Sequence, residues 1–280
     1  MMGAVVITGA GSGIGRALAL AYAEPGRVVL LLGRRRTALQ ETAVQVRARG
    51  ARAELRTVDV CDGAALDRIA ADFAGGFGSV AVLIANAGIS HGTLTAEPAD
   101  RTVFAEIVAT NLIGVELTCG AFLPYLAPQA RIAGIASVAG FRGLPGAAAY
   151  SASKAGAIAY LESLRLELRD RGIRVCSIAP GYVATPMTAE NHYPMPWLMP
   201  VDQAAAKMRR AIDRGRPWCV LPWQMAVLGT LLRHLPIAIY DPILPGWQEN
   251  GGGRATTRRN PEPCGGRSRL LDEESFPQRC

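Results

Sequence analysis

The sequence predicts an α/β fold in a single domain: a doubly wound parallel β-sheet of about seven strands, flanked by helices. Two observations lead to this prediction. Short runs rich in Val, Ile and Leu alternate with longer segments of helical periodicity, and the runs show no alternation with polar residues. Strands that are apolar on both faces are typical of a parallel sheet covered by helices on each side. Right-handed crossovers between such strands give the doubly wound topology.

The expected elements follow one another in strand–helix order. The expected strands are Ala4–Thr8, Val28–Leu32, Ala53–Val58, Val80–Ala85, Arg131–Ala136, Arg174–Ala179 and Trp218–Leu221. The expected helices are Gly13–Glu24, Thr37–Arg49, Leu66–Phe73, Thr102–Leu126, Tyr150–Arg171 and Asp202–Arg214. Asn111 lies within the longest stretch between two strands, although asparagine is a poor helix former.

The chain after Leu221 changes character twice. Residues 1–222 contain all the expected strands and form the predicted domain. Residues 223–248 are apolar but interrupted by charges and prolines, and fall short of the roughly 20 apolar residues that a membrane span requires. We expect them to cover a ligand cleft or form a subunit contact, with a membrane surface as the less favoured alternative. Residues 249–280 are rich in Gly, Pro and Arg, which predicts a disordered tail.

A glycine-rich turn follows the first strand. The stretch TGAGSGIG consists of Thr8, Gly9, Ala10, Gly11, Ser12, Gly13, Ile14 and Gly15. Its spacing is neither GxGxxG nor, without a following GK[ST], that of a P-loop. The missing Cβ atoms let the backbone turn tightly and approach a pyrophosphate, while the next helix offers free N–H groups. We therefore expect a dinucleotide here, the alternative being a tight turn without a ligand.

The end of the second strand indicates which dinucleotide binds. An acidic residue at this place would hold the 2′-hydroxyl of NAD, but the chain has Gly33 followed by Arg34. A cation suits the 2′-phosphate of NADP, so NADP is favoured over NAD. Arg35 or Arg36 could share this role, and a solvated loop cation is the alternative for Arg34.

Further residues with polar or turn chemistry follow three other strands. Asp59 follows the third strand, the triplet NAG follows the fourth and PGYVATP (180–186) follows the sixth. Each could be ordinary turn chemistry. In an open parallel sheet, however, ligands bind outside the carboxyl ends of the strands, and these residues all lie at that edge. Together they predict one ligand site.

These motifs resemble the short-chain dehydrogenase/reductase family between Val5 and Leu221. In order they are TGAGSGIG, Asp59-Val60, Asn86-Ala87-Gly88, Asn111, Ser137, YSASK (150–154) and PGYVATP. Any one is weak, but seven in this order and spacing are specific. The resemblance implies a Rossmann-like fold, a nicotinamide cofactor bound by residues 1–222, and redox chemistry at an alcohol or carbonyl.

The resemblance also implies roles for individual residues. Asp59 and Val60 would hold the adenine, while Asn86, Ala87 and Gly88 would support a ribose of the cofactor. Within the stretch that begins with Pro180 and Gly181, Thr185 would bind the nicotinamide carboxamide, with Val183 nearby. Lys154 would bind the nicotinamide ribose beside Tyr150, and Asn111 would hold a water in a proton relay behind Lys154.

Tyr150 and Lys154 have a spacing that suits proton transfer. Residues four apart lie one above the other on a helix. Carbonyl reduction needs a hydride from the cofactor and a proton for the oxygen. Tyrosine has an ordinary pKa near 10, and a cation within about 4–6 Å lowers such a value by roughly 1–3 units. We therefore expect Tyr150 to be the general acid/base, tuned by Lys154.

Ser137 and Asn111 complete the predicted catalytic set. Ser137, at the end of the fifth strand, is expected to hydrogen-bond the substrate oxygen. The alternatives are a turn hydroxyl for Ser137 and a polar residue that bends the helix for Asn111. A dinucleotide-binding regulator without turnover is the competing class of function, although such a protein has no chemical need for this set.

The substrate-binding candidates lie in loops after the fourth, fifth and sixth strands. They are His91, Ser137, Phe141 and Met187, with Arg142, Leu144, His192, Tyr193 and Trp197 in the same loops. This mixture favours an apolar small-molecule substrate over a sugar.

The composition excludes several other classes. The six cysteines are scattered without a CxxC pair, so neither a metal site nor a disulfide framework is expected. The net charge of +7 is dispersed apart from 34–36, and we expect no nucleic-acid partner. No N-terminal signal precedes the apolar run at Ala4, which predicts a cytoplasmic protein. The family resemblance implies a homodimer or homotetramer.

Overall fold

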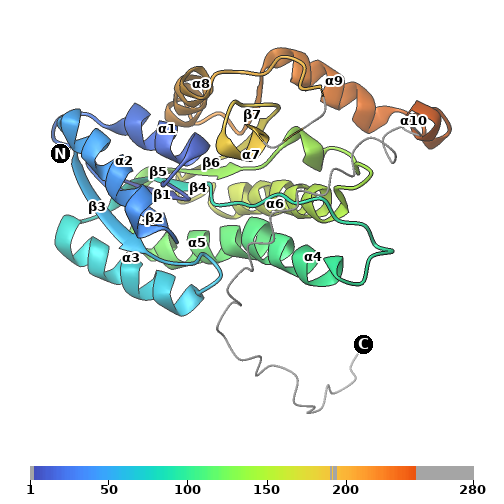
Figure 1. Cartoon of the computed structure of the whole chain (residues 1–280). Helices are drawn as coiled ribbons and strands as arrows, with labels where there is room; N and C mark the ends of the chain where they lie inside the picture. Colours follow the sequence, from blue (N-terminus) through green and yellow to red (C-terminus); the bar gives the residue numbers. More distant parts are fainter. Residues whose placement is uncertain (1–2, 190, 192–193, 244–280) are drawn as a thin grey trace, which may run out of the picture.

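The computed structural model describes residues 3–189, 191 and 194–243 (Figure 1). Seven parallel strands form one sheet in the order β3-β2-β1-β4-β5-β6-β7. They are β1 (Ala4–Thr8), β2 (Val28–Gly33), β3 (Arg52–Thr57), β4 (Val80–Ala85), β5 (Leu126–Ile135), β6 (Arg174–Pro180) and β7 (Trp218–Leu221). The strand order reverses between β1 and β4, which creates a crevice for ligands at their carboxyl ends. The predicted doubly wound, Rossmann-like fold is confirmed.

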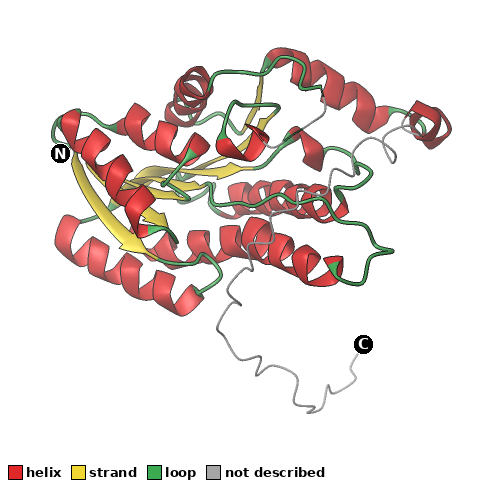
Figure 2. Cartoon of the chain, viewed as in Figure 1, coloured by secondary structure: helices red, strands yellow, loops and turns green. Residues whose placement is uncertain are grey.

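Helices cover both faces of the sheet (Figure 2). One face packs against α1 (Gly13–Tyr22), α2 (Arg36–Ala48) and α8 (Val201–Asp213). The other packs against α3 (Gly63–Phe77), α5 (Gly114–Phe122) and α6 (Ala148–Glu167). The buried strand residues alternate between the two cores, with Val5 and Ile7 on the first face and Ala4 and Val6 on the second. This explains why the strand sequences are continuously apolar.

The expected helix at Thr102–Leu126 is confirmed as a continuous helical run, Asp100–Tyr125, although the run is not regular. It consists of α4 (Asp100–Val108), the π-helical turn η1 (Ala109–Ile113), α5 and the 3₁₀ turn η2 (Leu123–Tyr125). The buried side chain of Asn111 lies in the π-turn and bonds to the backbone of Ile89. A π-turn adds a residue to the helix, and such turns are frequent at functional sites.

One helical run among the described residues, Asp100–Tyr125, is long and apolar enough to cross a bilayer by length and composition. Its residues Val115, Cys119 and Phe122 are buried in the core beneath the sheet. Packing inside the domain therefore accounts for the apolar character of this buried part of the run.

Two helices follow β7 in the part of the chain that the structure describes. They are α9 (Trp223–His234) and α10 (Ile237–Ile243). α9 lies against the loops after β5 and β6, where Met225 contacts Gly181 and Gly229 is pressed against the Phe141 ring. α10 is joined to the loop after β5 by a hydrogen bond from the Tyr240 hydroxyl to the carbonyl oxygen of Gly143, 2.6 Å long. The inner side of residues 223–243 thus covers the carboxyl edge of the sheet. The tail predicted at 249–280 lies outside the described residues.

Candidate active site

The glycine-rich turn between β1 and α1 has the geometry of a phosphate-binding loop. Gly9 and Gly13 have φ angles of 64° and 50°, a region that favours glycine. A Cβ on Gly15 would overlap the carbonyl oxygen of Gly9, so the turn requires glycine there. The turn runs directly into α1, which begins at Gly13 and whose first N–H groups are free to hold a pyrophosphate. The residues of this turn therefore fit the dinucleotide.

Thr8 and Asn86 lock this turn to the segment after β4. The Thr8 hydroxyl oxygen accepts hydrogen bonds from the N–H groups of Asn86 and Ala87, at 2.9 and 3.0 Å. The Asn86 amide nitrogen donates to the carbonyl oxygen of Thr8 at 2.9 Å. The TGAGSGIG and NAG motifs thus form one rigid floor at the switch point of the sheet.

Two arginines follow β2, at the end of this floor where the adenosine of the cofactor is expected. Arg34 follows β2 and pairs with Asp59, with 3.6 Å between Nη1 and Oδ2. Arg35 donates a hydrogen bond to the Ser12 hydroxyl in the glycine turn, at 3.2 Å. Val60, next to Asp59, is buried against Gly114. Two cations therefore flank the place expected for the adenosine ribose.

Lys154 and Tyr150 lie one turn apart on α6, as their spacing predicts. The Lys154 amine is buried and donates to the carbonyl oxygen of Ile135, at 2.8 Å. It lies 5.8 Å from the centre of the Tyr150 ring. Burial lowers the pKa of Lys154 from its ordinary value to about 8. The small residues of YSASK let α6 approach the end of β5 this closely.

Ser137 lies two residues beyond β5, close in sequence to Ile135, whose carbonyl oxygen holds Lys154. Its hydroxyl oxygen accepts a hydrogen bond from the N–H of Ala139 at 3.1 Å. The turn η3 (Val138–Gly140) then presses Gly140 against the backbone of Lys154 and Ala155, closer than a side chain would allow. The carbonyl that holds Lys154 and the serine hydroxyl thus belong to one short segment.

Asn111 joins the segment after β4 to α6. Its Oδ1 accepts from the N–H of Ile89, and its Nδ2 donates to the carbonyl oxygen of Ile89, both at 2.9 Å. Nδ2 also lies 3.2 Å from the Ser153 hydroxyl. The Cβ position of Gly88 is 3.1 Å from Asn111 Oδ1 and 3.4 Å from Lys154 Nζ. The structure therefore brings Asn111, Ser137, Tyr150 and Lys154 together.

The PGYVATP segment lies across from the glycine turn. Thr185 Cβ is 3.4 Å from the Cβ position of Gly13, and Val183 is buried. Pro180 ends β6, and the N–H of Gly181 bonds to the carbonyl oxygen of Leu221 at 2.8 Å. Short contacts thus hold this segment at the edge where the cofactor's nicotinamide half is expected.

The substrate-binding candidates are more dispersed. His91 and Met187 are exposed, whereas Phe141 stacks on Trp218 with 5.6 Å between ring centres. His192 and Tyr193 lie outside the described residues. Among the described residues, no group of three or more His, Cys, Asp or Glu could hold a metal ion.

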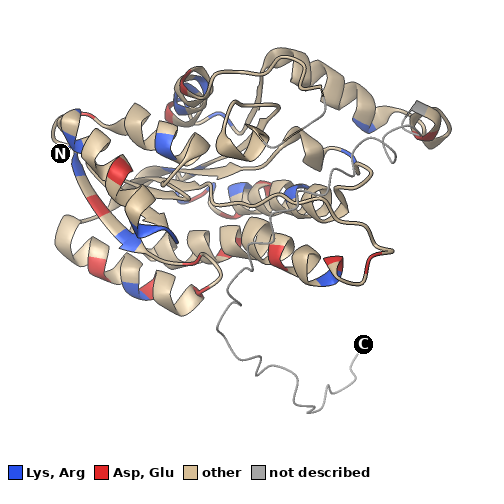
Figure 3. Ribbon diagram, in the orientation of Figure 1, with Lys and Arg blue, Asp and Glu red and all other residues tan. Residues whose placement is uncertain are grey.

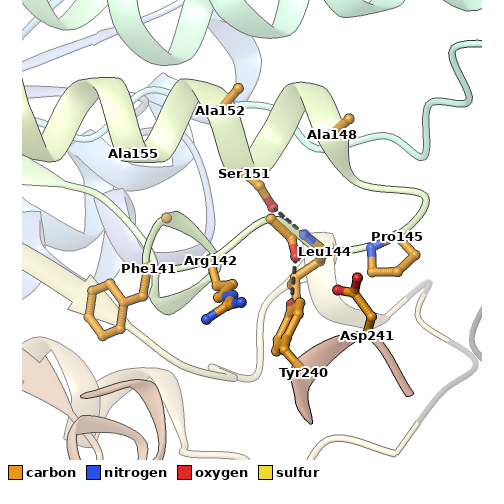
Figure 4. Close-up of a pocket in the computed structure, with 12 residues that line it drawn as sticks. Phe141, Arg142, Leu144, Pro145, Ala148, Ser151, Ala152, Ala155, Tyr240 and Asp241 are labelled. Carbon is orange, nitrogen blue, oxygen red and sulfur yellow. Dashed lines mark hydrogen bonds between the residues drawn. The ribbon is translucent and has the colours of Figure 1, made fainter. Parts of the chain in front are cut away.

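A cavity of about 710 Å³ lies between the α6 side that carries Ala148, Ser151, Ala152 and Ala155, the loop 140–145, and α10 (Figure 4). Of the substrate-binding candidates Phe141, Arg142 and Leu144 line it, but Ser137, Tyr150 and Lys154 do not. This hollow is therefore distinct from the catalytic cluster.

Sequence reasoning missed two residues that organise this region. Tyr240 bonds to Gly143 and carries the Arg142 guanidinium 3.9 Å above its ring centre. Ser153 is a hydrogen-bond partner of Asn111. The position of Ser153 inside YSASK was an available signal, whereas nothing in the sequence connected Tyr240 with a loop 97 residues away.

Comparison with known proteins identifies the family. Residues 3–195 match the sequence model described as short chain dehydrogenase. An uncharacterized oxidoreductase of Myxococcus xanthus (strain DK1622) is 41% identical over 239 residues, which are 84% of this chain and 94% of the relative.

Two solved structures are also similar. A short-chain dehydrogenase/reductase of Burkholderia phymatum in complex with NAD has a TM-score of 0.74 and 27% identity, over 82% of this chain and 92% of the other. An alcohol dehydrogenase of the archaeon Thermococcus sibiricus, complexed with 5-hydroxy-NADP, has a TM-score of 0.71 and 26% identity, over 79% and 96%. The chain therefore belongs to the short-chain dehydrogenase/reductase family and is an NAD(P)-dependent oxidoreductase acting on alcohol or carbonyl groups.

Proposed function

We propose that the protein is an NADP-dependent reductase or dehydrogenase that interconverts a carbonyl and a secondary alcohol of an apolar substrate, with Tyr150 as the general acid/base. The observation that carries the proposal is the buried Lys154 amine, anchored on Ile135 and 5.8 Å from the Tyr150 ring centre. The nicotinamide supplies the hydride, or accepts it in the reverse direction.

In the reduction direction, Tyr150 gives its hydroxyl proton to the substrate oxygen as the oxygen gains charge. The Lys154 cation stabilises the phenolate that this step leaves. Its pKa of about 8 still leaves the amine mostly protonated at neutral pH. Ser137 accepts a hydrogen bond from Ala139, so its own O–H is free to donate to the substrate oxygen.

Asn111 is a positioning residue in this proposal. Its amide connects the backbone of Ile89 with Ser153, the neighbour of Lys154. These bonds fix the distance between the NAG floor and α6. The family resemblance implies a relay water behind Lys154, and this water would lie next to the segment that Asn111 holds by these hydrogen bonds.

The preference for NADP is supported by the two arginines at the adenosine end, Arg34 beside Asp59 and Arg35 beside Ser12. No acidic residue follows Gly33 to hold a 2′-hydroxyl there. An apolar substrate is supported by the sequence of the loops after β5 and β6, which carry Phe141, Leu144 and Met187.

The first prediction tests the acid/base. Tyr150→Phe is expected to lower kcat by about 100- to 10,000-fold, because the proton donor is removed while the ring is kept. NADPH binding, followed by fluorescence titration, and the melting temperature should change little. Tyr160→Phe, on the same helix, is the control and should keep wild-type turnover. Retention of most of the rate in Tyr150→Phe would place the proton donor elsewhere. NADPH binding by the wild type without turnover of any carbonyl in a panel graded by size and polarity would favour a regulator.

A further inference from the structure

The glycine-rich turn after β1 is fastened to α2 as well as to the segment after β4. Thr42, a buried residue of α2, has its hydroxyl 3.0 Å from the carbonyl oxygen of Ala10 and 3.0 Å from that of Ala38 in its own helix. Gly11 approaches the helix so closely that its Cβ position is 3.1 Å from the Ala38 Cβ. The turn therefore lies directly against α2.

Arg16 joins the same turn to α2 from the side of α1. It is the charged residue of α1, and its partner Glu41 lies on α2 (Figure 3). Arg16 Nη2 donates to the carbonyl oxygen of Gly11 at 2.7 Å and to Glu41 Oε2 at 2.8 Å. Its Nε donates to the Thr42 hydroxyl oxygen at 3.1 Å. Because the guanidinium is already paired with a carboxylate, its role here is to hold the turn and not to attract an anion.

These hydrogen bonds fix the direction of two successive peptide groups. In a trans peptide, the C=O of one residue and the N–H of the next point in opposite directions. The carbonyl oxygens of Ala10 and Gly11 point to Thr42 and Arg16, so the N–H groups of Gly11 and Ser12 point away from these side chains. Neither N–H has a hydrogen-bond partner among the described residues. Two successive donors thus stay free just before α1, where the pyrophosphate is expected.

We propose that Thr42 and Arg16 are positioning residues for the dinucleotide: they hold the carbonyl groups of Ala10 and Gly11 against α2 and so keep two N–H groups turned toward the pyrophosphate. Successive N–H groups of this kind form a concave site for an anion. Without these bonds either peptide group would be free to rotate and present its carbonyl oxygen to the phosphates. The proposal requires only that the chain binds NAD(P), and depends neither on the preference for NADP nor on Tyr150.

The test is fluorescence titration of the full-length protein with NADPH and with NADH. Thr42→Val removes the hydroxyl at similar size and should raise Kd about fivefold or more, the effect of one lost hydrogen bond. The factor should be the same for both cofactors, because both contain the pyrophosphate. Thr42→Ser keeps the hydroxyl and should restore a Kd near that of the wild type. Arg16→Lys should raise both Kd values, because an amine cannot replace the planar guanidinium that bonds to Gly11, Glu41 and Thr42.

Two matched controls separate positioning from stability. Thr118→Val removes the hydroxyl of another buried helix threonine, which bonds to the carbonyl oxygen of Gly114 in its own helix at 2.6 Å. Arg47→Lys changes an α2 arginine that donates to the carbonyl oxygen of Ala53 at 2.7 Å. Both controls should bind NADPH and NADH like the wild type. Melting temperatures are expected to fall in both Thr→Val variants, whereas the loss of affinity should occur in Thr42→Val alone.

Four outcomes would overturn the proposal. Thr42→Val and Arg16→Lys could both bind like the wild type, which would mean that the turn keeps its geometry without them. Thr42→Ser could fail to restore binding, or Thr118→Val could lose as much affinity as Thr42→Val, and either result would indicate a general loss of stability. A loss confined to NADPH would place the two residues at the 2′-phosphate. A wild type that binds NADPH but reduces no carbonyl would reject the proposed catalytic function and leave this test valid.

Discussion

Lys154 brings an amine into the interior of the protein, where burial lowers its pKa from the ordinary 10.5 to about 8. Between these two pH values the unfolded chain holds the proton and the folded chain does not. The contribution of Lys154 therefore makes the free energy of unfolding rise with pH across this window. Below pH 8 the cost of the buried charge is fully present. Lys154, which the proposed chemistry needs, thus lowers the free energy of unfolding of the cofactor-free protein at neutral pH.

Removing this amine should therefore stabilise the protein without its cofactor. We expect Lys154→Met to raise the free energy of unfolding at pH 7 by about 1–3 kcal/mol, after allowing for the lost hydrogen bond to Ile135, and to abolish turnover. The gain should shrink as the pH rises from 8 to 10.5. Urea unfolding of the variant and the wild type at several pH values measures it, since other titrating groups cancel in the difference. Lys207→Met, at an exposed site on α8, is the control. A gain that grew with pH would contradict the assignment of this shift to Lys154.

Arg34 and Arg35 carry the proposed preference for NADP. Charge-assisted hydrogen bonds contribute about 1.5–3 kcal/mol, so the double variant Arg34→Ala/Arg35→Ala should raise KM for NADPH about 10- to 100-fold. KM for NADH should change little, because NADH has no 2′-phosphate. Steady-state kinetics with both cofactors measures this, and Arg36→Ala, at an exposed position beside them, is the control. Equal losses with both cofactors would mean that neither arginine reads the phosphate.

At the scale of elements, local pattern predicted the strands well because they are buried on both faces. The exception is β5, which begins at Leu126 and not at Arg131. Its first residues include Pro128 and Gln129, which carry no strand signal. The π-turn at 109–113 was not predictable either, because the bonds of Asn111 go to Ile89, 22 residues away. When a helix is interrupted because a side chain bonds to a distant segment, the hydrophobic periodicity of its sequence does not show the interruption.

The features of the candidate site also divide into local ones, which the sequence predicts, and long-range ones, which it does not. The glycine turn and the Tyr150–Lys154 spacing are local, and the sequence sufficed to identify both. The hydrogen bond from Lys154 to Ile135 and the contact of Arg142 with Tyr240 join distant segments, and only the fold reveals them. For residues 223–243 the sequence left several alternatives because apolar residues occur all around α9. The structure separates a covered side from an exposed one.

At the scale of the whole molecule, the layer formed by α4, η1 and α6 lies apart from α9 and α10 (Figure 1). It includes Phe104, Ile113 and Leu166, which are all exposed. The family resemblance implies a dimer through these helices. This layer carries acids as well as arginines, with Glu106 on α4 and Glu162 on α6. Mixed charge allows two copies to meet without net repulsion.

We therefore expect the wild type to have a mass twice the 29.6 kDa of the chain, or a higher multiple, in light scattering after gel filtration. Leu166→Glu should lower this mass, because each copy would place a carboxylate in an apolar contact that lies close to its own symmetry mate. Val44→Glu adds the same charge at an equally exposed apolar position on α2 and should leave the mass unchanged. If Leu166→Glu kept the wild-type mass, the subunits would meet through another surface. That result would reject the contact through α4 and α6.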